Sequence, residues 1–102
     1  VLKYQAGAFP GSPATLGGMT GFAPYDIEHA SAECWDVVSN RPKCAAYRAP
    51  GAPMAAFGVE SVLDELAQKL GLCPLELRLK NAAKAGTRAL YGPKFPEIGY
   101  VE

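Results

Sequence analysis

The sequence lacks a net charge, a long apolar run and more than one histidine. Ten Lys and Arg residues balance ten Asp and Glu residues among its 102 residues. Nucleic acids and anionic membrane surfaces attract proteins through an electrostatic field of one sign, and this sequence does not supply one. No segment approaches the roughly 20 consecutive apolar residues that span a bilayer. We therefore expect neither nucleic-acid nor membrane partners.

The three cysteines are too few and too far apart for a structural zinc site. Cys34, Cys44 and Cys73 form no C-x-x-C pair, whereas structural zinc takes four nitrogen or sulfur ligands with short paired spacings. The first residues have neither the basic region nor the apolar core of a secretory signal. We interpret the cysteines as reduced thiols of a cytoplasmic protein, and we expect Cys34 and Cys44 to pack as small hydrophobic side chains.

Glycine and proline, in contrast, are abundant. There are 11 glycines and 9 prolines, which predicts many turns and irregular segments. Hydrophobic residues still make up 49% of the chain, so we expect a folded core of modest size rather than a disordered linker.

The first half of the chain is typical of strands joined by loops. Residues 2–6 alternate between apolar and polar side chains, as in a half-buried strand. Residues 16–21 predict a flexible glycine-rich turn, because a phosphate-binding loop would add a Lys-Ser/Thr pair. We place Trp35 in the core. Two or three further strands are expected among residues 25–28, 32–38 and 44–47.

The second half contains two predicted helices. Apolar residues recur every three or four positions over residues 54–70, which indicates one apolar helix face; they are Ala56, Val59, Val62, Leu63, Leu66 and Leu70. We place Glu60 and Asp64 on the opposite, solvated face. Pro53 suits the first turn and Gly71 the position after the end. A second helix is expected from Pro74 to a point between Ala82 and Gly86.

These elements together predict an α+β fold in a single partial domain. Short antiparallel strands and loops occupy residues 1–48, a loop and the two helices occupy residues 49–86, and residues 87–102 form an irregular tail.

Side chains suited to catalysis are scarce. His29 is the only histidine, and in a strand its side chain points away from those of Asp26 and Glu28. An independent small hydrolase that uses His29 remains a remote alternative, because a hydrolytic triad also needs a nucleophile nearby in space.

The loop over residues 46–53 has the composition of an anion site. Arg48 follows an apolar segment and precedes a run of Ala, Pro and Gly. Small residues let backbone N–H groups approach a ligand, and the start of the following helix favours negative charge. An arginine at such a place suits a phosphate or an oxo-anion; the alternative is that Arg48 pairs with a carboxylate in a rigid connector.

Four segments also carry motifs in a specific order. They read Y-Q-A-G-A-F-P at 4–10, A-P-Y-D-I at 23–27, A-Y-R-A-P-G-A-P at 46–53, and D-E-L-A at 64–67 followed by L-G-L-C-P-L-E-L-R at 70–78. Together they resemble the large, molybdopterin-binding subunits of the xanthine dehydrogenase and aldehyde oxidase family, the molybdenum hydroxylases, whose loop reads A-[FY]-R-G-x-G-x-P. The resemblance covers nearly the whole chain.

The resemblance implies a piece of the larger molybdopterin-binding domain. Members hydroxylate aldehydes or aromatic heterocycles with oxygen from water, and electrons leave through iron–sulfur and flavin domains or subunits, which are the implied partners. The family's arginine lies at the molybdenum centre, which assigns Arg48, with Tyr47 and Ala49, as cofactor-binding residues. Ala49 and Pro50 differ from the cysteine of carbon monoxide dehydrogenases and the phenylalanine of purine-oxidising members, so neither substrate is favoured.

The chain is much shorter than the family's large subunit. By the resemblance, the catalytic glutamate and the glycine-rich cofactor segment belong to parts that these residues do not include. We therefore expect no catalytic residue, no metal ligand, no bound cofactor and no activity of this chain alone. An alternative is a cofactor-free binding or scaffold module. In either case we expect an exposed apolar side of the 54–70 helix and a homo-oligomer, with exchange of residues 1–10 or 87–102 as one possible route.

Overall fold

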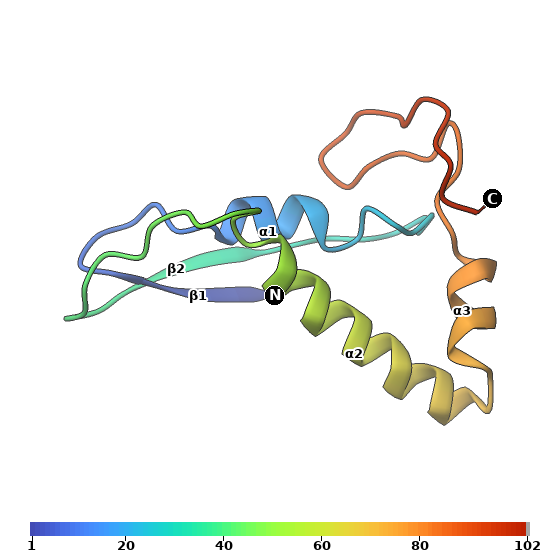
Figure 1. Ribbon diagram of the computed structural model, residues 1–102, viewed down its shortest axis with the longest axis horizontal. Coiled ribbons are helices and arrows are strands. Elements are labelled where there is room, and N and C mark those ends of the chain that lie inside the picture. Colours follow the sequence, from blue (N-terminus) through green and yellow to red (C-terminus); the bar gives the residue numbers. More distant parts are fainter. Residues whose placement is uncertain (102) are drawn as a thin grey trace.

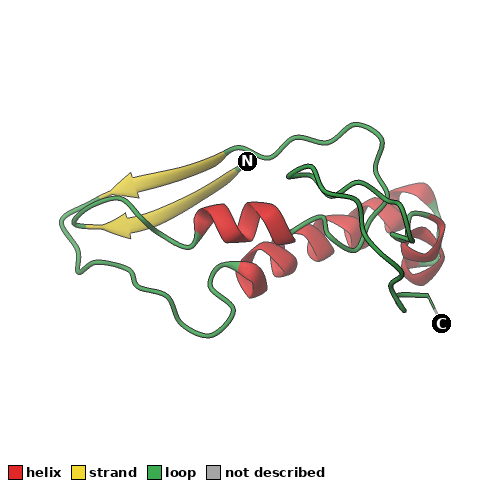
Figure 2. Ribbon diagram, turned by 90° about the horizontal axis from the view of Figure 1, so that it is seen from above, coloured by secondary structure: helices red, strands yellow, loops and turns green. Residues whose placement is uncertain are grey.

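The two strands of the molecule lie side by side and run in parallel. The computed structural model describes residues 1–101. Strands β1 (Leu2–Gly7) and β2 (Cys34–Val38) form a two-stranded sheet in which Leu2 lies opposite Cys34 and Gln5 opposite Val37. Figure 2 shows both arrows pointing the same way. The α+β class and both strands were predicted from the sequence, but the antiparallel arrangement was wrong.

A helix between the strands explains the parallel arrangement. Parallel strands need a crossover of a dozen or more residues, usually one that contains a helix. Helix α1 (Ala14–Thr20) supplies it, so the prediction of a flexible turn over residues 16–21 was also wrong. The Ser12 hydroxyl accepts a hydrogen bond from the Ala14 N–H at 3.1 Å, and the Pro13 carbonyl accepts one from the Gly17 N–H at 3.1 Å.

The glycine pair Gly17-Gly18 lets helix α1 pack closely against two other parts of the chain, one on each side. A Cβ atom on Gly17 would lie 3.0 Å from the carbonyl oxygen of Gly51, and one on Gly18 would overlap the Cys34 sulfur. Gly17 therefore allows contact with the chain at the start of α2, and Gly18 allows contact with the sheet.

The two predicted helices are confirmed as α2 (Ala52–Leu70) and α3 (Pro74–Lys80). Pro53 and Pro74 lie in the first turns, and Gly71 ends α2 in the left-handed conformation with φ 66°. Helix α3 ends at least two residues earlier than predicted, where the Asn81 side chain donates a hydrogen bond to the Leu77 carbonyl at 2.8 Å. In Figure 1, α2 runs away from the sheet and α3 follows at its far end.

Two of the predicted strand segments form no strand. Residues 44–47 are irregular, and within 25–28 only Tyr25 forms a single antiparallel bridge, to Ala82. Backbone hydrogen bonds on both sides attach this segment to the chain after α3: Asp26 donates to Asn81 and Ala83 donates to Pro24, each at 2.8 Å. The described part of the tail, residues 87–101, contains no helix or strand and only one bridge, between Arg88 and Lys94; Glu102 of the predicted tail lies outside the described residues.

The core consists mostly of small side chains. Trp35 is 57% exposed and Cys34 is exposed, so both core predictions were wrong. Cys44 is half-buried, and its thiol donates to the Gln5 carbonyl at 2.8 Å. The buried apolar residues are Ala6, Ala14, Tyr25, Ala55, Ala67, Leu77, Ala83 and Ala89.

The molecule is open for its size. Its accessible surface is 7367 Å², about 1,800 Å² more than the surface of a compact protein of equal mass. Its radius of gyration is 15.3 Å, against about 13 Å for a compact chain of this length. The predicted apolar exposure along α2 is confirmed by Phe57, Val62 and Leu70. No helix among residues 1–101 is both long and apolar enough to cross a membrane.

Candidate functional site

Tyr47, Arg48 and Ala49 lie on the loop that connects β2 to α2. All three are exposed, with Tyr47 at 88%. The Arg48 guanidinium forms no ion pair with any carboxylate of residues 1–101. Within residues 1–101 Arg48 therefore lacks the carboxylate partner of the alternative interpretation, and the residue is exposed to solvent.

The backbone after Arg48 turns sharply before α2 begins. Ala49 and Gly51 both have positive φ, 54° and 82°, a conformation that is unfavourable for alanine and easy for glycine. The Ala52 N–H donates to the Ala49 carbonyl at 3.1 Å. A Cβ on Gly51 would overlap the Pro13 carbonyl, so the turn packs closely against the start of α1.

The start of α2 offers fewer free donors than the sequence suggested. The N–H of Ala52 is already used within the turn, and Pro53 has no N–H to donate. The attraction of this loop for an anion therefore depends mainly on the guanidinium of Arg48, which presents up to five donors in a planar arrangement.

A polar cluster joins α2 to α3 and to the segment after α1. The Tyr25 hydroxyl donates to the Glu60 carboxylate at 2.7 Å, and Arg78 binds Glu60 and Asp64 at 2.8 Å each. Burial and the neighbouring Glu60 carboxylate raise the pKa of Tyr25, and hydrogen bonds to Glu60 and Asp64 raise the pKa of Arg78. The prediction that Glu60 lies on a solvated face was wrong, because Glu60 is the centre of this structural cluster.

The histidine has no catalytic geometry. The imidazole of His29 is 91% exposed, and its Nε2 atom lies 3.7 Å from the Glu28 carboxylate. A general base acts on a nucleophile within hydrogen-bond reach, and among residues 1–101 His29 has only the Glu28 carboxylate as a side-chain partner. Within residues 1–101, no three His, Cys, Asp or Glu side chains lie close enough together to hold a metal ion.

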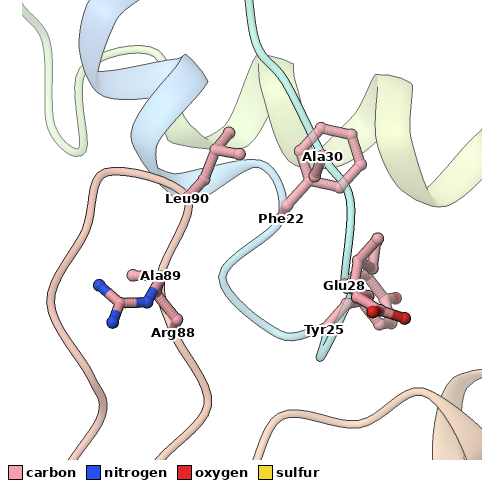
Figure 3. Close-up of a pocket in the computed structure, with 8 residues that line it drawn as sticks. Phe22, Tyr25, Glu28, Ala30, Arg88, Ala89 and Leu90 are labelled. Atoms are coloured by element: carbon pink, nitrogen blue, oxygen red, sulfur yellow. The ribbon is translucent and has the colours of Figure 1, made fainter.

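A small cavity lies between residues 22–30, which follow α1, and the described C-terminal tail, residues 87–101, called the C-terminal arm below. Its volume is about 150 Å³, below the roughly 300 Å³ at which ligand pockets begin. In Figure 3, Leu90 and Ala89 of the arm lie on one side, and Phe22 and Glu28 lie on the other. Arg48 does not line this cavity, so the cavity is separate from the predicted site.

Most of the chain is similar in sequence to a known protein family. Residues 3–82 match the family described as the molybdopterin cofactor-binding domain. The chain belongs to this family. The matched region runs from β1 through α3 and includes the Arg48 loop, whereas the C-terminal arm lies outside it. The family resemblance read from the motifs is thereby confirmed.

The chain is also similar to subunits of known molybdenum enzymes. It is 40% identical over 75 residues to a putative xanthine dehydrogenase molybdenum-binding subunit of Escherichia coli, covering 72% of this chain and 10% of that protein. It is 42% identical over 76 residues to an aldehyde oxidoreductase of Megalodesulfovibrio gigas, covering 74% of this chain and 8% of that protein. The chain thus spans about a tenth of the length of these curated relatives.

Proposed function

We propose that this chain forms one segment of a molybdopterin-binding subunit and supplies Arg48 to the cofactor site. The observation that carries the proposal is the position of Arg48. It is exposed, free of ion pairs within residues 1–101, and followed by a turn with two positive φ angles at the start of α2.

The residues of this loop fit an anionic group. The guanidinium of Arg48 is a fixed positive charge that binds phosphate or oxo-anions through paired hydrogen bonds. Ala49 adds no bulk beside it, and Tyr47 projects into solvent, where it offers an apolar ring and a hydroxyl. When bound, molybdopterin would supply the metal for oxidative hydroxylation; this chain's contribution is to bind and orient the group.

The loop is exposed, and it does not enclose a ligand. Because the chain spans about a tenth of the relatives quoted above, we propose that other segments complete the pterin pocket and carry the catalytic base. Iron–sulfur and flavin domains or subunits would accept the electrons, and the assembly would work in the cytoplasm. This chain alone would have no hydroxylase activity.

An anion titration tests the role of Arg48 without the rest of the subunit. We expect molybdate, followed by backbone amide NMR, to shift the resonances of residues 48–52 in a saturable way. The change Arg48→Ala should abolish these shifts, because it removes the only charge that the loop directs at the anion. Arg41→Ala is the matched control, since Arg41 is another exposed arginine on the connection between β2 and α2.

Metal and pterin analysis of the purified chain gives an independent measurement. We expect molybdenum and pterin well below one per chain, because the pocket is incomplete.

In the molybdate titration, amide shifts that persist in Arg48→Ala, or that Arg41→Ala removes equally, would contradict the assignment of Arg48.

A further inference from the structure

Ala49 is the only residue other than glycine that has a positive φ angle among residues 1–101. Its φ of 54° lies in the left-handed region, where the Cβ atom of an L-residue comes too close to the carbonyl oxygen. The position before Pro50 makes this conformation less favourable still, because a residue before proline prefers an extended backbone with negative φ. A strained conformation of this kind persists only where the surrounding structure enforces it.

The chain after Ala49 enforces this conformation through a tight turn. The Ala52 N–H donates to the Ala49 carbonyl at 3.1 Å. The ring of Pro50 fixes its own φ, and Gly51 has φ 82° and ψ −27°. These are the features of a type II β-turn with proline and glycine at its two central positions. Because a Cβ on Gly51 would overlap the Pro13 carbonyl, the turn is fixed by its contact with the start of α1 as well as by its own residues.

The chain before Arg48 is held much less firmly. In Figure 1 this green segment runs from the far end of β2 back to the start of α2 without forming a helix or strand. The Cys44 N–H donates to the Ala6 carbonyl at 3.0 Å. The next residues, 45–48, make no hydrogen bond or ion pair within residues 1–101. Arg48 is therefore anchored from one side, through its peptide bond to Ala49.

We propose that Ala49 is a positioning residue for Arg48. In the left-handed region alanine is confined to a small range of φ and ψ, whereas glycine moves freely into other regions. The methyl group of Ala49 therefore transmits the rigidity of the turn to the backbone at Arg48. A loop that is ordered before binding loses less conformational freedom when its ligand binds, so it binds more tightly. The proposal rests on the proposed role of Arg48 and adds a cause for the order of its loop.

The change Ala49→Gly tests this role without blocking the fold, because glycine adopts the same φ without strain. We expect the NMR order parameter of the Arg48 amide, measured without anion, to fall from about 0.85 to below about 0.6. We expect the dissociation constant for molybdate to rise about 5-fold, as for a loop that is ready to bind about one fifth of the time. The midpoint of urea denaturation should change little, because relief of strain offsets the greater freedom of the unfolded chain.

Ala46→Gly is the matched control. It removes the same methyl group from an exposed position on the other side of Arg48, where φ is not positive. We expect it to leave the order parameter of the Arg48 amide and the dissociation constant near the values of the parent chain. A purely structural role of Ala49 would instead lower the denaturation midpoint of Ala49→Gly and leave the order of the folded loop unchanged.

The outcomes separate this proposal from the role of Arg48 itself. A parent chain without saturable molybdate shifts would contradict the role of Arg48, and this proposal with it. Saturable shifts with equal dissociation constants in the parent chain and in Ala49→Gly would contradict the role of Ala49 alone. An Arg48 amide that is equally ordered in these two proteins, or equal effects of the two glycine variants, would also overturn the proposal.

Discussion

The start and the middle of α2 are attached to the rest of the molecule in different ways. Near its start, α2 meets α1 through backbone and single methyl groups: Gly17 and Gly21 lie against Gly51 and Ala55. Near its middle, α2 is attached through long polar side chains, in which Glu60 binds both Tyr25 and Arg78. The first junction depends on the absence of side chains, and the second depends on their charges.

The difference between the two junctions predicts where substitutions lower the stability of the fold the most. Glycine contacts have no side chain that can rotate away, so an added methyl group must move backbone. The polar junction is partly exposed, with Glu60 at 36% and Asp64 at 61%, so water and the remaining partners replace part of a lost bond. We therefore expect larger losses of stability at the first junction than at the second.

The largest expected effect comes from Gly51→Ala. The new Cβ would overlap the Pro13 carbonyl, and φ is 82° at this position, so strain and overlap add. We expect the free energy of unfolding to fall by about 3 kcal/mol or more, as measured by urea denaturation.

Gly58→Ala is the control for this change, because its Cβ enters open space in a helix. In dilute solution it should raise the free energy of unfolding by up to about 1 kcal/mol. Similar losses in both variants would show that the close contact at Gly51 does not determine the stability of this junction.

Glu60→Gln should have a smaller effect. The amide still accepts the Tyr25 hydroxyl, but Arg78 keeps only Asp64 as a charged partner. We expect a loss of about 1–2 kcal/mol in the free energy of unfolding, and a weaker salt dependence than in the parent chain.

Asp64→Asn is the comparison variant and should lower the free energy of unfolding by about 0.5 kcal/mol or less, because that carboxylate is more exposed. A loss at Glu60 as large as the one at Gly51 would contradict the contrast between the two junctions.

The smallest expected effect on stability comes from Asp36 of β2, whose carboxylate makes exposed polar contacts. Hydrogen bonds from the Ser12 hydroxyl and from the N–H groups of Gly11 and Ser12 lower the pKa of Asp36 below its ordinary value of 3.8. A lowered folded-state pKa means that the stabilisation is present above that ordinary value and is lost as the pH falls toward the folded-state pKa.

Urea denaturation between pH 6 and pH 2 measures this effect. We expect Asp36→Asn to be less stable than the parent chain at pH 6 and to lose less stability on acidification. Glu33→Gln, at an exposed carboxylate beside β2, should follow the parent curve. Parallel curves for the parent chain and Asp36→Asn would contradict the assigned pKa shift.

Local patterns in the sequence were sufficient to predict several helices and strands and to identify the loop around Arg48 as the candidate site. The apolar repeat between Pro53 and Gly71 predicted α2, and alternation over residues 2–6 predicted β1, because these signals depend on neighbours along the chain. The motif around Arg48 indicated the family for the same reason. The role of Glu60 could not be predicted, since its partners Tyr25 and Arg78 are 35 and 18 residues away.

The sequence by itself determined the helices α2 and α3, the two strands, the balance of charge and the family. Only the tertiary structure decided that β1 and β2 run in parallel. It also decided that the glycine pair Gly17-Gly18 lies in a helix rather than in a turn. It further decided that Glu60 joins three segments of the chain. The physical reason is that propensity and periodicity act within a few residues, whereas strand direction, close backbone contact and ion pairing depend on which distant segments come together.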